Sequence, residues 1–194
     1  MTLIYANLNN KGRADNYTRQ TIKKVEGSGS NMTITYEGEA LDKNKKPLSS
    51  TPAIVSYTVY IRNGFMEWDM KSFATPGTEG LIEIEGDKLR IPSSLAPGVK
   101  LDDVNFTMNV NMGFKITTTI ALTDQECIAI EEVKVPAGTF MCHKVKQTSS
   151  ATAMRRTLTT KTITWYAPGI GTVKSETYNA KEQLQSSMAL ESIE

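Results

Sequence analysis

The chain has 194 residues, with 22 Lys and Arg against 21 Asp and Glu, and a formal net charge of +1. This length fits one domain, expected to span residues 1–194, and it is enough to bury a core without a metal or a disulfide. The charge balance argues against a nucleic-acid-binding protein, and no run reaches the roughly 18 apolar residues of a transmembrane helix. Two Cys and one His exclude a metal site built from His alone or from Cys alone.

The composition favours strands over helices. Thr occurs 24 times, and Thr, Val, Ile and Tyr all suit a pleated, half-buried surface. Alternation of apolar and polar residues dominates the chain, and no segment predicts a long helix. Residues 181–194 fit both a helical spacing and a clean alternation, and we interpret them as a strand. The predicted class is therefore all-β: an antiparallel barrel or half-barrel of about a dozen strands, built from consecutive hairpins.

Turn signals recur along the chain in order. Leu3–Tyr5 already have the pattern of the middle of a strand, and no signal peptide is visible. We therefore expect any leader to have been removed before Met1. Asn63-Gly64 is the strongest hairpin signal, because a type I′ turn needs positive φ at both positions. Further turns are expected at 9–12, 27–30, 86–87, 97–98, 136–138 and 179–180. Gly86-Asp87 is expected to join strand 81–85 to strand 88–91, and 42–53 and 92–103 are expected to be long loops.

One alternating run has the composition of a ligand-binding face. Its parity favours either one long strand bent at Gly113 or a hairpin with an odd-numbered loop. Flexible Met side chains beside Phe and Ile can line an adaptable apolar pocket, although an ordinary β core has the same composition. The predicted apolar ligand face consists of Phe106, Met108, Val110, Met112, Phe114 and Ile116. Trp68, Trp165 and Tyr166 are candidate ligand platforms or, alternatively, core residues.

Two motifs have a clear turn chemistry. The first is VPAGTFMCHKV at 135–145, where Pro136 presets φ and Gly138 supplies a permissive corner. The second is TWYAPGIGTVKSE at 164–176, where Pro168-Gly169 fits a type II turn and Gly171 predicts a bulge or a close backbone approach. The residues to which we assign a structural role are Pro136, Gly138, Phe140, Trp165, Tyr166, Pro168, Gly169 and Gly171.

These two motifs resemble the TapB-like group of bacterial cell-envelope proteins that is common in Bacteroidetes, which is similar to exported lipoproteins of the YmcC-like fold. The stretch from Gly86-Asp87 to Gly98 fits more loosely, and the first 60 residues fit mainly by strand pattern. The resemblance implies an exported all-β protein in the periplasm or at the outer-membrane surface, with a lipid anchor upstream of this chain as one expectation. It implies no catalytic residue.

Cys142-His143 has the composition of a thiol–imidazole dyad, but neighbouring strand residues point to opposite faces. A turn centred on Ala137-Gly138 would place Val133 opposite Cys142, Glu132 opposite His143 and Glu131 opposite Lys144. That register also separates the two Cys beyond disulfide range, so we expect reduced, half-buried thiols.

The acidic residues give no convincing site. Asp102-Asp103 with Asn105 lacks the spacing of a calcium loop, and Glu83 with Glu85 is interpreted as the solvated face of a strand. We therefore assign no catalytic, cofactor-binding or metal-binding residue. The sequence predicts a non-enzymatic exported envelope protein that acts as a structural or interaction module. The alternative is a carrier of a hydrophobic ligand, such as a lipid or an acyl chain, and the expected partner is an envelope protein or such a ligand.

Overall fold

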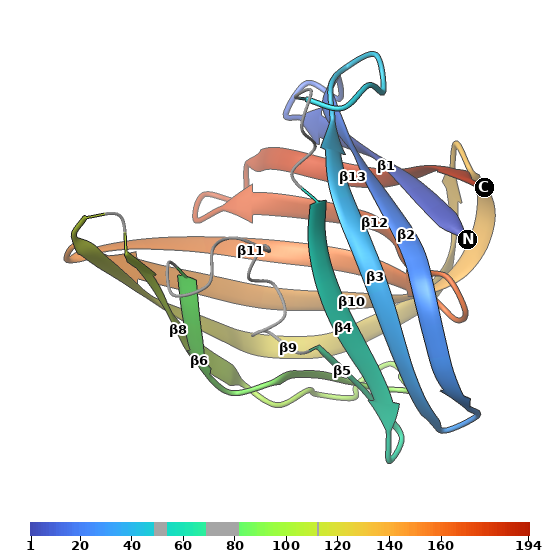
Figure 1. Ribbon diagram of the computed structural model, residues 1–194, viewed down its shortest axis with the longest axis horizontal. Coiled ribbons are helices and arrows are strands. Elements are labelled where there is room, and N and C mark those ends of the chain that lie inside the picture. The colour runs from blue at the N-terminus through green and yellow to red at the C-terminus, as the bar shows by residue number, and fades with distance from the viewer. Residues whose placement is uncertain (49–53, 69–81, 112) are drawn as a thin grey trace.

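A computed structural model describes residues 1–48, 54–68, 82–111 and 113–194 (Figure 1). These residues form one antiparallel sheet of thirteen strands and contain no helix, which confirms the all-β half-barrel prediction. The strands are β1 Thr2–Asn9, β2 Ala14–Ser28, β3 Asn31–Leu41, β4 Ile54–Arg62, β5 Phe65–Trp68, β6 Ile82–Gly86, β7 Leu89–Pro92, β8 Val104–Asn111, β9 Lys115–Val135, β10 Gly138–Ala153, β11 Arg156–Ala167, β12 Gly171–Asn179 and β13 Leu184–Ile193.

The order of the strands places the chain ends in the middle of the sheet. The order is β6-β8-β9-β10-β11-β12-β13-β1-β2-β3-β4-β5-β7. Thr2 and Glu194 exchange backbone hydrogen bonds of 2.7 and 2.8 Å, which ties β1 to the end of the chain just beyond β13. The two edge strands, β6 and β7, come from the middle of the sequence.

The predicted hairpin at Gly86-Asp87 is wrong. β6 pairs with β8 and β7 pairs with β5, so the two strands lie at opposite edges of the sheet. Only two residues separate Gly86 from Leu89, and a chain of three Cα–Cα steps spans at most about 11 Å. The edges of the sheet are therefore held close together by the chain itself, without a ladder of hydrogen bonds between them.

Strands β10 and β11 carry buried side chains on both faces of the sheet. Trp165 and Cys142 belong to one cluster of buried side chains, and Val145 belongs to a second, against which Tyr166 packs. Trp165 and Tyr166 are adjacent on β11, so they point to opposite faces of the sheet. A strongly twisted sheet accounts for this, because β9–β12 run across the molecule behind the upright β2–β4 (Figure 1).

The β9–β10 hairpin curls at its tip to reach β13. The Ala137 backbone N–H donates to the carbonyl of Leu190 at 3.2 Å. The turn is Pro136-Ala137, with Val135 paired to Gly138, so the strands are shifted by two residues from the predicted register. Cys142 therefore lies opposite Glu131, and the predicted cross-strand pairing of His143 with Glu132 is wrong, because Ile130 is opposite His143.

Several turns agree with the residues that predicted them. Asn63 and Gly64 both have positive φ, as a type I′ turn requires, and join β4 to β5. Ile170 donates to the Ala167 carbonyl with Gly169 at φ 76°, which is the predicted type II turn. Asn111 pairs with Lys115, so β8 and β9 form the hairpin with an odd-numbered loop.

Three further turns are held by the same kind of hydrogen bond from the backbone to a side chain. Asn9, Asp42 and Asn179 each accept two backbone N–H bonds through a side-chain oxygen, from the residues two and four positions later. The Lys46 and Asn44 N–H groups thereby lower the pKa of the Asp42 carboxyl. The polar side chain replaces backbone pairing where the strands separate, which explains why these loops stay tight.

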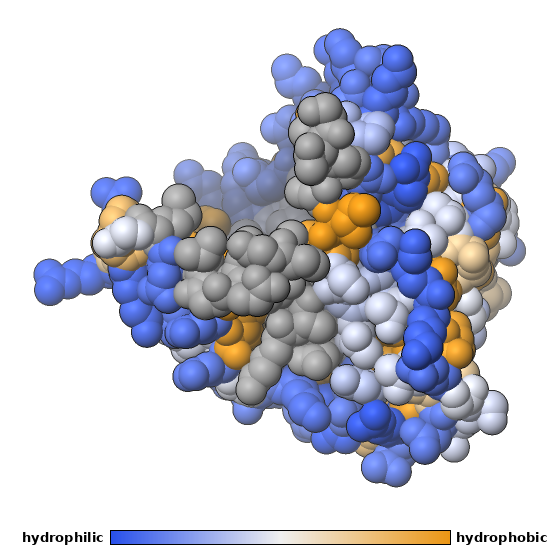
Figure 2. Space-filling view, in the orientation of Figure 1, coloured by the Kyte–Doolittle hydropathy of each residue, from blue (hydrophilic) through white to orange (hydrophobic). Residues whose placement is uncertain are grey.

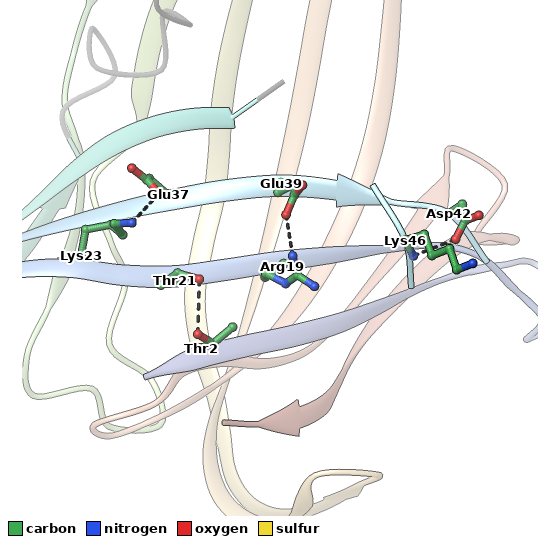
Figure 3. Close-up of polar contacts among 8 residues, drawn as sticks. All are labelled: Thr2, Arg19, Thr21, Lys23, Glu37, Glu39, Asp42 and Lys46. Atoms are coloured by element: carbon green, nitrogen blue, oxygen red, sulfur yellow. Dashed lines mark hydrogen bonds and ion pairs between the residues drawn. The ribbon is translucent and has the colours of Figure 1, made fainter. Parts of the chain in front are cut away.

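Charged pairs cover the outer face of β2 and β3. Arg19 lies directly opposite Glu39, and their side chains meet at 2.7 Å, while Lys23 and Glu37 meet at 3.1 Å (Figure 3). A pair at the surface such as Lys23–Glu37 contributes roughly 0–1 kcal/mol. The main effect of these pairs is to fix which face of these strands meets solvent, because Thr18 and Gln20 on either side of Arg19 point the other way.

Both thiols are more buried than the sequence predicted. Cys127 and Cys142 are free and 0% exposed, in separate core clusters, and burial raises the pKa of each thiol. We expect neither thiol to react with iodoacetamide in the native protein and both to react in denaturant without a reductant, as two added carbamidomethyl masses. A single fast-reacting thiol in the native protein would contradict the burial of that side chain.

Candidate ligand cavity on the concave face

The concave face of the half-barrel holds two adjoining cavities. The larger has a volume of about 330 Å³ and the smaller about 170 Å³. Both are lined by Tyr36, Met66, Tyr166, Ile170 and Gly171, so they adjoin along these residues. Figure 2 shows hydrophilic residues along much of the outline of this view, an apolar patch beside the start of β4 and paler residues further along β3 and β4.

The larger cavity has mostly apolar walls. Ile34 on β3, Ile61 on β4 and Ile91 on β7 contribute from one side, and Tyr166 on β11 contributes from the other. Leu95 lines the cavity as well, and it belongs to the segment between β7 and β8.

That segment is anchored to β9 rather than looping away from the sheet. Gly98 donates to the Cys127 carbonyl and Cys127 donates to the Val99 carbonyl, at 2.8 and 2.9 Å. The predicted turn at Pro97-Gly98 forms, with Gly98 at φ 90° and Val99 bonded to Ala96. The 92–103 loop is therefore part of the cavity wall, held by a short ladder on β9.

Tyrosines dominate the smaller cavity. The Tyr36 and Tyr57 rings stack with their centroids 5.2 Å apart, and the Tyr5 hydroxyl donates to the Thr172 carbonyl at 3.0 Å. Burial raises the pKa of Tyr5, Tyr36, Tyr57 and Tyr166 above the ordinary value of 10.0. All four hydroxyls therefore stay protonated at neutral pH, and this wall is aromatic and uncharged.

One polar atom in the cavity wall has no protein partner. His143 lines the larger cavity from β10, and its Nδ1 is buried without a hydrogen bond to any described residue. A buried nitrogen in this state costs free energy unless something else bonds to it. Cys142 is in the cluster that contains Trp165, on the opposite face of β10, so the two side chains form no dyad.

The predicted apolar ligand face lies on the same side of the sheet as these cavities but away from their walls. Phe106 is opposite Ile120, which is opposite Ala151, and Ala151 is an even number of positions from Val145 in the second cluster. Phe106, Met108, Val110 and Ile116 are half-buried, whereas Phe114 is 64% exposed at the hairpin tip. Met112 lies outside the described residues.

The motif residues occupy three places. Pro136, Gly138 and Phe140 form or flank the curled hairpin tip, where Phe140 packs against the cluster of Trp165. Pro168, Gly169 and Gly171 line the larger cavity together with Tyr166. The bulge predicted at Gly171 falls instead at Val173, where β11 and β12 change register, and a Cβ on Gly171 would meet nothing within 4 Å.

Sequence reasoning missed the tyrosines and the role of His143. Trp68 and Tyr166 were predicted as platforms or core, and both line the smaller cavity while packing against the second cluster. Alternation along a strand separates its two faces, but it does not say which face of the strand is concave. The sequence suggests only two roles for His143, a dyad with Cys142 and a cross-strand pair with Glu132, and neither places it in a cavity.

Within the part of the chain that the structure describes, no three His, Cys, Asp or Glu side chains come together as a metal site would need. No helix long and apolar enough to cross a membrane occurs there either.

The fold and the cavity define a class of protein: an open antiparallel half-barrel with an apolar hollow on its concave face. The chain belongs to the DUF3108-like family, whose family model matches residues 1–190. None of the curated proteins is significantly similar to it.

Two solved structures have the same fold. A Bacteroides fragilis protein described by a YmcC-like fold and inferred to be exported shares 25% identity at a TM-score of 0.78. A Parabacteroides distasonis protein inferred to be a lipoprotein shares 22% identity at a TM-score of 0.81. Each match covers 100% of this chain and 94% of the other. The expected YmcC-like fold is confirmed, and the two neighbours are described as an exported protein and a lipoprotein.

Proposed function

We propose that this protein acts in the cell envelope by binding rather than by catalysis, and that it holds a hydrophobic ligand on its concave face. The observation that carries this proposal is the apolar cavity of about 330 Å³ next to one of about 170 Å³. Small-molecule sites are typically about 300–1,000 Å³, mostly apolar, with a few polar groups that orient the ligand.

The ligand class follows from the walls. Ile, Met, Leu and Tyr side chains favour an aliphatic chain, and the Nδ1 of His143 supplies one hydrogen-bonding group within them. The best match is an amphiphile such as a fatty acid, with its chain along Ile34 and Ile61 and its polar end at His143. Burial of the chain supplies most of the affinity, about 0.8 kcal/mol per CH₂ group.

A cavity-filling variant tests this proposal. Met66 lines both cavities, so Met66→Trp is expected to weaken binding of the neutral dye N-phenyl-1-naphthylamine at least about ten-fold, because the indole occupies the ligand's volume. Met141 is 58% exposed and lines neither cavity, so Met141→Trp is the matched control and should bind the dye as wild type does.

The ligand itself is identified by native mass spectrometry of protein purified from a periplasm, followed by organic extraction. An adduct of several hundred daltons that extracts as a lipid, and is lost in Met66→Trp, supports the proposal. Dye binding that is absent from wild type, or equal in both Trp variants, rejects the cavity as the site and leaves an interaction module without a small ligand.

A further inference from the structure

Two hairpin tips carry large apolar side chains that are mostly exposed to solvent. Phe114 lies between β8 and β9 and is 64% exposed. Met154 lies between β10 and β11 and is 71% exposed, and Leu158, four residues later on β11, is 66% exposed. These side chains line neither of the concave cavities. Apolar side chains that gather at one end of a molecule and stay in water indicate a contact outside the chain.

The two tips project from the same end of the sheet, and the β8–β9 tip extends three residues further than the β10–β11 tip. Thr118 near the start of β9 pairs with Ala153 at the end of β10, so the residues just beyond each strand end project from the same end of the sheet. Figure 1 shows both turns together at the left of the view, remote from the chain termini.

This end of the half-barrel is also basic. Lys115, Arg155 and Arg156 are exposed beside the apolar side chains, and none forms an ion pair with a residue that the structure describes. Residues 113–118 and 151–159 contain no Asp or Glu. Glu83, on the strand next to β8, lies opposite Asn109, which is several residues back from the tip.

The β10–β11 turn holds two residues in a backbone conformation that their side chains disfavour. Met154 and Arg155 have φ of 48° and 62°, the left-handed region that Asn and Gly favour. The β4–β5 hairpin of the same chain makes a turn with two positive φ values using Asn63 and Gly64. The fold thus holds a long apolar and a long basic side chain where the backbone alone would favour two small residues. Such strain is typical of positions whose side chains serve a function.

We propose that this end of the half-barrel docks on a lipid surface with anionic headgroups. Phe114, Met154 and Leu158 enter the boundary between headgroups and acyl chains, while Lys115 and the two Arg residues bind lipid phosphates. Both tips are narrow and convex, so their long side chains suit a soft, penetrable surface better than the matched hollow that a protein partner would have to supply. The negative charge of the headgroups complements these three cations, which form no ion pair with any described residue.

Co-sedimentation with vesicles tests this. Wild type is expected to sediment with equimolar phosphatidylcholine and phosphatidylglycerol, to stay in solution with phosphatidylcholine alone, and to be released by salt. Arg155→Gln with Arg156→Gln should weaken binding roughly 30-fold, since each Arg near such a surface contributes about a five-fold factor. Phe114→Ser should weaken it by about ten-fold or more through loss of apolar burial.

The matched control removes two exposed cations from another hairpin tip, as Lys11→Gln with Arg13→Gln, and should bind as wild type does. Met154→Asn with Arg155→Gly relaxes the turn, so it should unfold at a higher temperature and yet bind vesicles less. Absence of sedimentation with the anionic vesicles, or equal loss in the control, overturns the proposal. The proposal is also overturned if the wild-type protein does not bind vesicles but self-associates, and Phe114→Ser abolishes that self-association. A second copy of the chain would then be the occupant of this surface.

Discussion

Replacing Gly86 by Ala is expected to lower the free energy of unfolding by about 4 kcal/mol. Gly86 has φ 132°, and a Cβ there would lie 2.4 Å from the Asn105 carbonyl oxygen and 2.6 Å from the Phe106 Cα. Left-handed strain costs about 1–3 kcal/mol, and pushing the β8 backbone away costs about as much again. Urea unfolding followed by tryptophan fluorescence measures the change.

Gly138→Ala is the matched control. Gly138 has almost the same φ, 142°, but its added Cβ would meet only the Phe140 ring at 3.6 Å, an ordinary contact. It therefore carries the strain without the backbone clash and should cost about 1–3 kcal/mol. Equal losses in the two variants would mean that the close approach of β6 to β8 does not matter, and that only φ does.

Truncating Trp165 has the largest expected effect of any single core change, about 3–5 kcal/mol for Trp165→Ala. The side chain is 5% exposed in the first core cluster, and its Nε1 donates to Glu131 Oε1 at 2.7 Å. Lys144 and Lys174, from the strands on either side, place their Nζ atoms 5.1 and 4.8 Å from the ring centroid. Thermal and urea unfolding would show the loss.

Trp165→Phe separates packing from polar contacts. It keeps an aromatic ring in the cluster and removes the hydrogen bond to Glu131, so it should cost only about 1–2 kcal/mol. A loss as large as that of the Ala variant would show that the Nε1–Glu131 bond, rather than ring packing, carries the stability.

The Glu131 bond also predicts the pH dependence of this difference. The hydrogen bond from Trp165 and the contact with Lys144 hold the pKa of Glu131 below its ordinary value of 4.5. Because the pKa of this carboxyl is lower in the folded protein than in the unfolded chain, the ionised carboxylate stabilises the fold at a pH above its unfolded-state pKa. This contribution is lost as the pH falls through the folded-state pKa. The gap between wild type and Trp165→Phe should therefore narrow as the pH is lowered from about 5 toward 3, and a gap independent of pH would contradict this assignment.

The sequence was most informative where one local signal decides the geometry. Asn63-Gly64 and Pro168-Gly169 each specify a turn through backbone preference alone. The alternation from Phe106 to Ile116 allows either one strand bent at Gly113 or a hairpin with an odd loop, and the structure has the hairpin. The register of the β9–β10 hairpin was missed by two residues, because Pro136-Ala137-Gly138 is compatible with either of two turn positions.

The concave site was less predictable, for a physical reason. Alternation shows that Trp165 and Tyr166 point to opposite faces of β11, but not that both faces are buried or which one is hollow. That depends on how far the sheet twists and on β6 and β7 lying at its two edges, and these follow from packing over the whole chain. The tyrosines at 5, 36 and 57 come together only once β1, β3 and β4 have been placed in the sheet.

The central position of β1 and β13 has a consequence for folding kinetics. The pairings from β1 through β5 and from β8 through β13 each join strands that follow one another in the chain, so each half is a meander of low contact order. The pairing of Leu3 with Ile193 joins almost the whole length of the chain and costs the most loop-closure entropy. We expect the two meanders to form first and their joining across β1 and β13 to limit the folding rate.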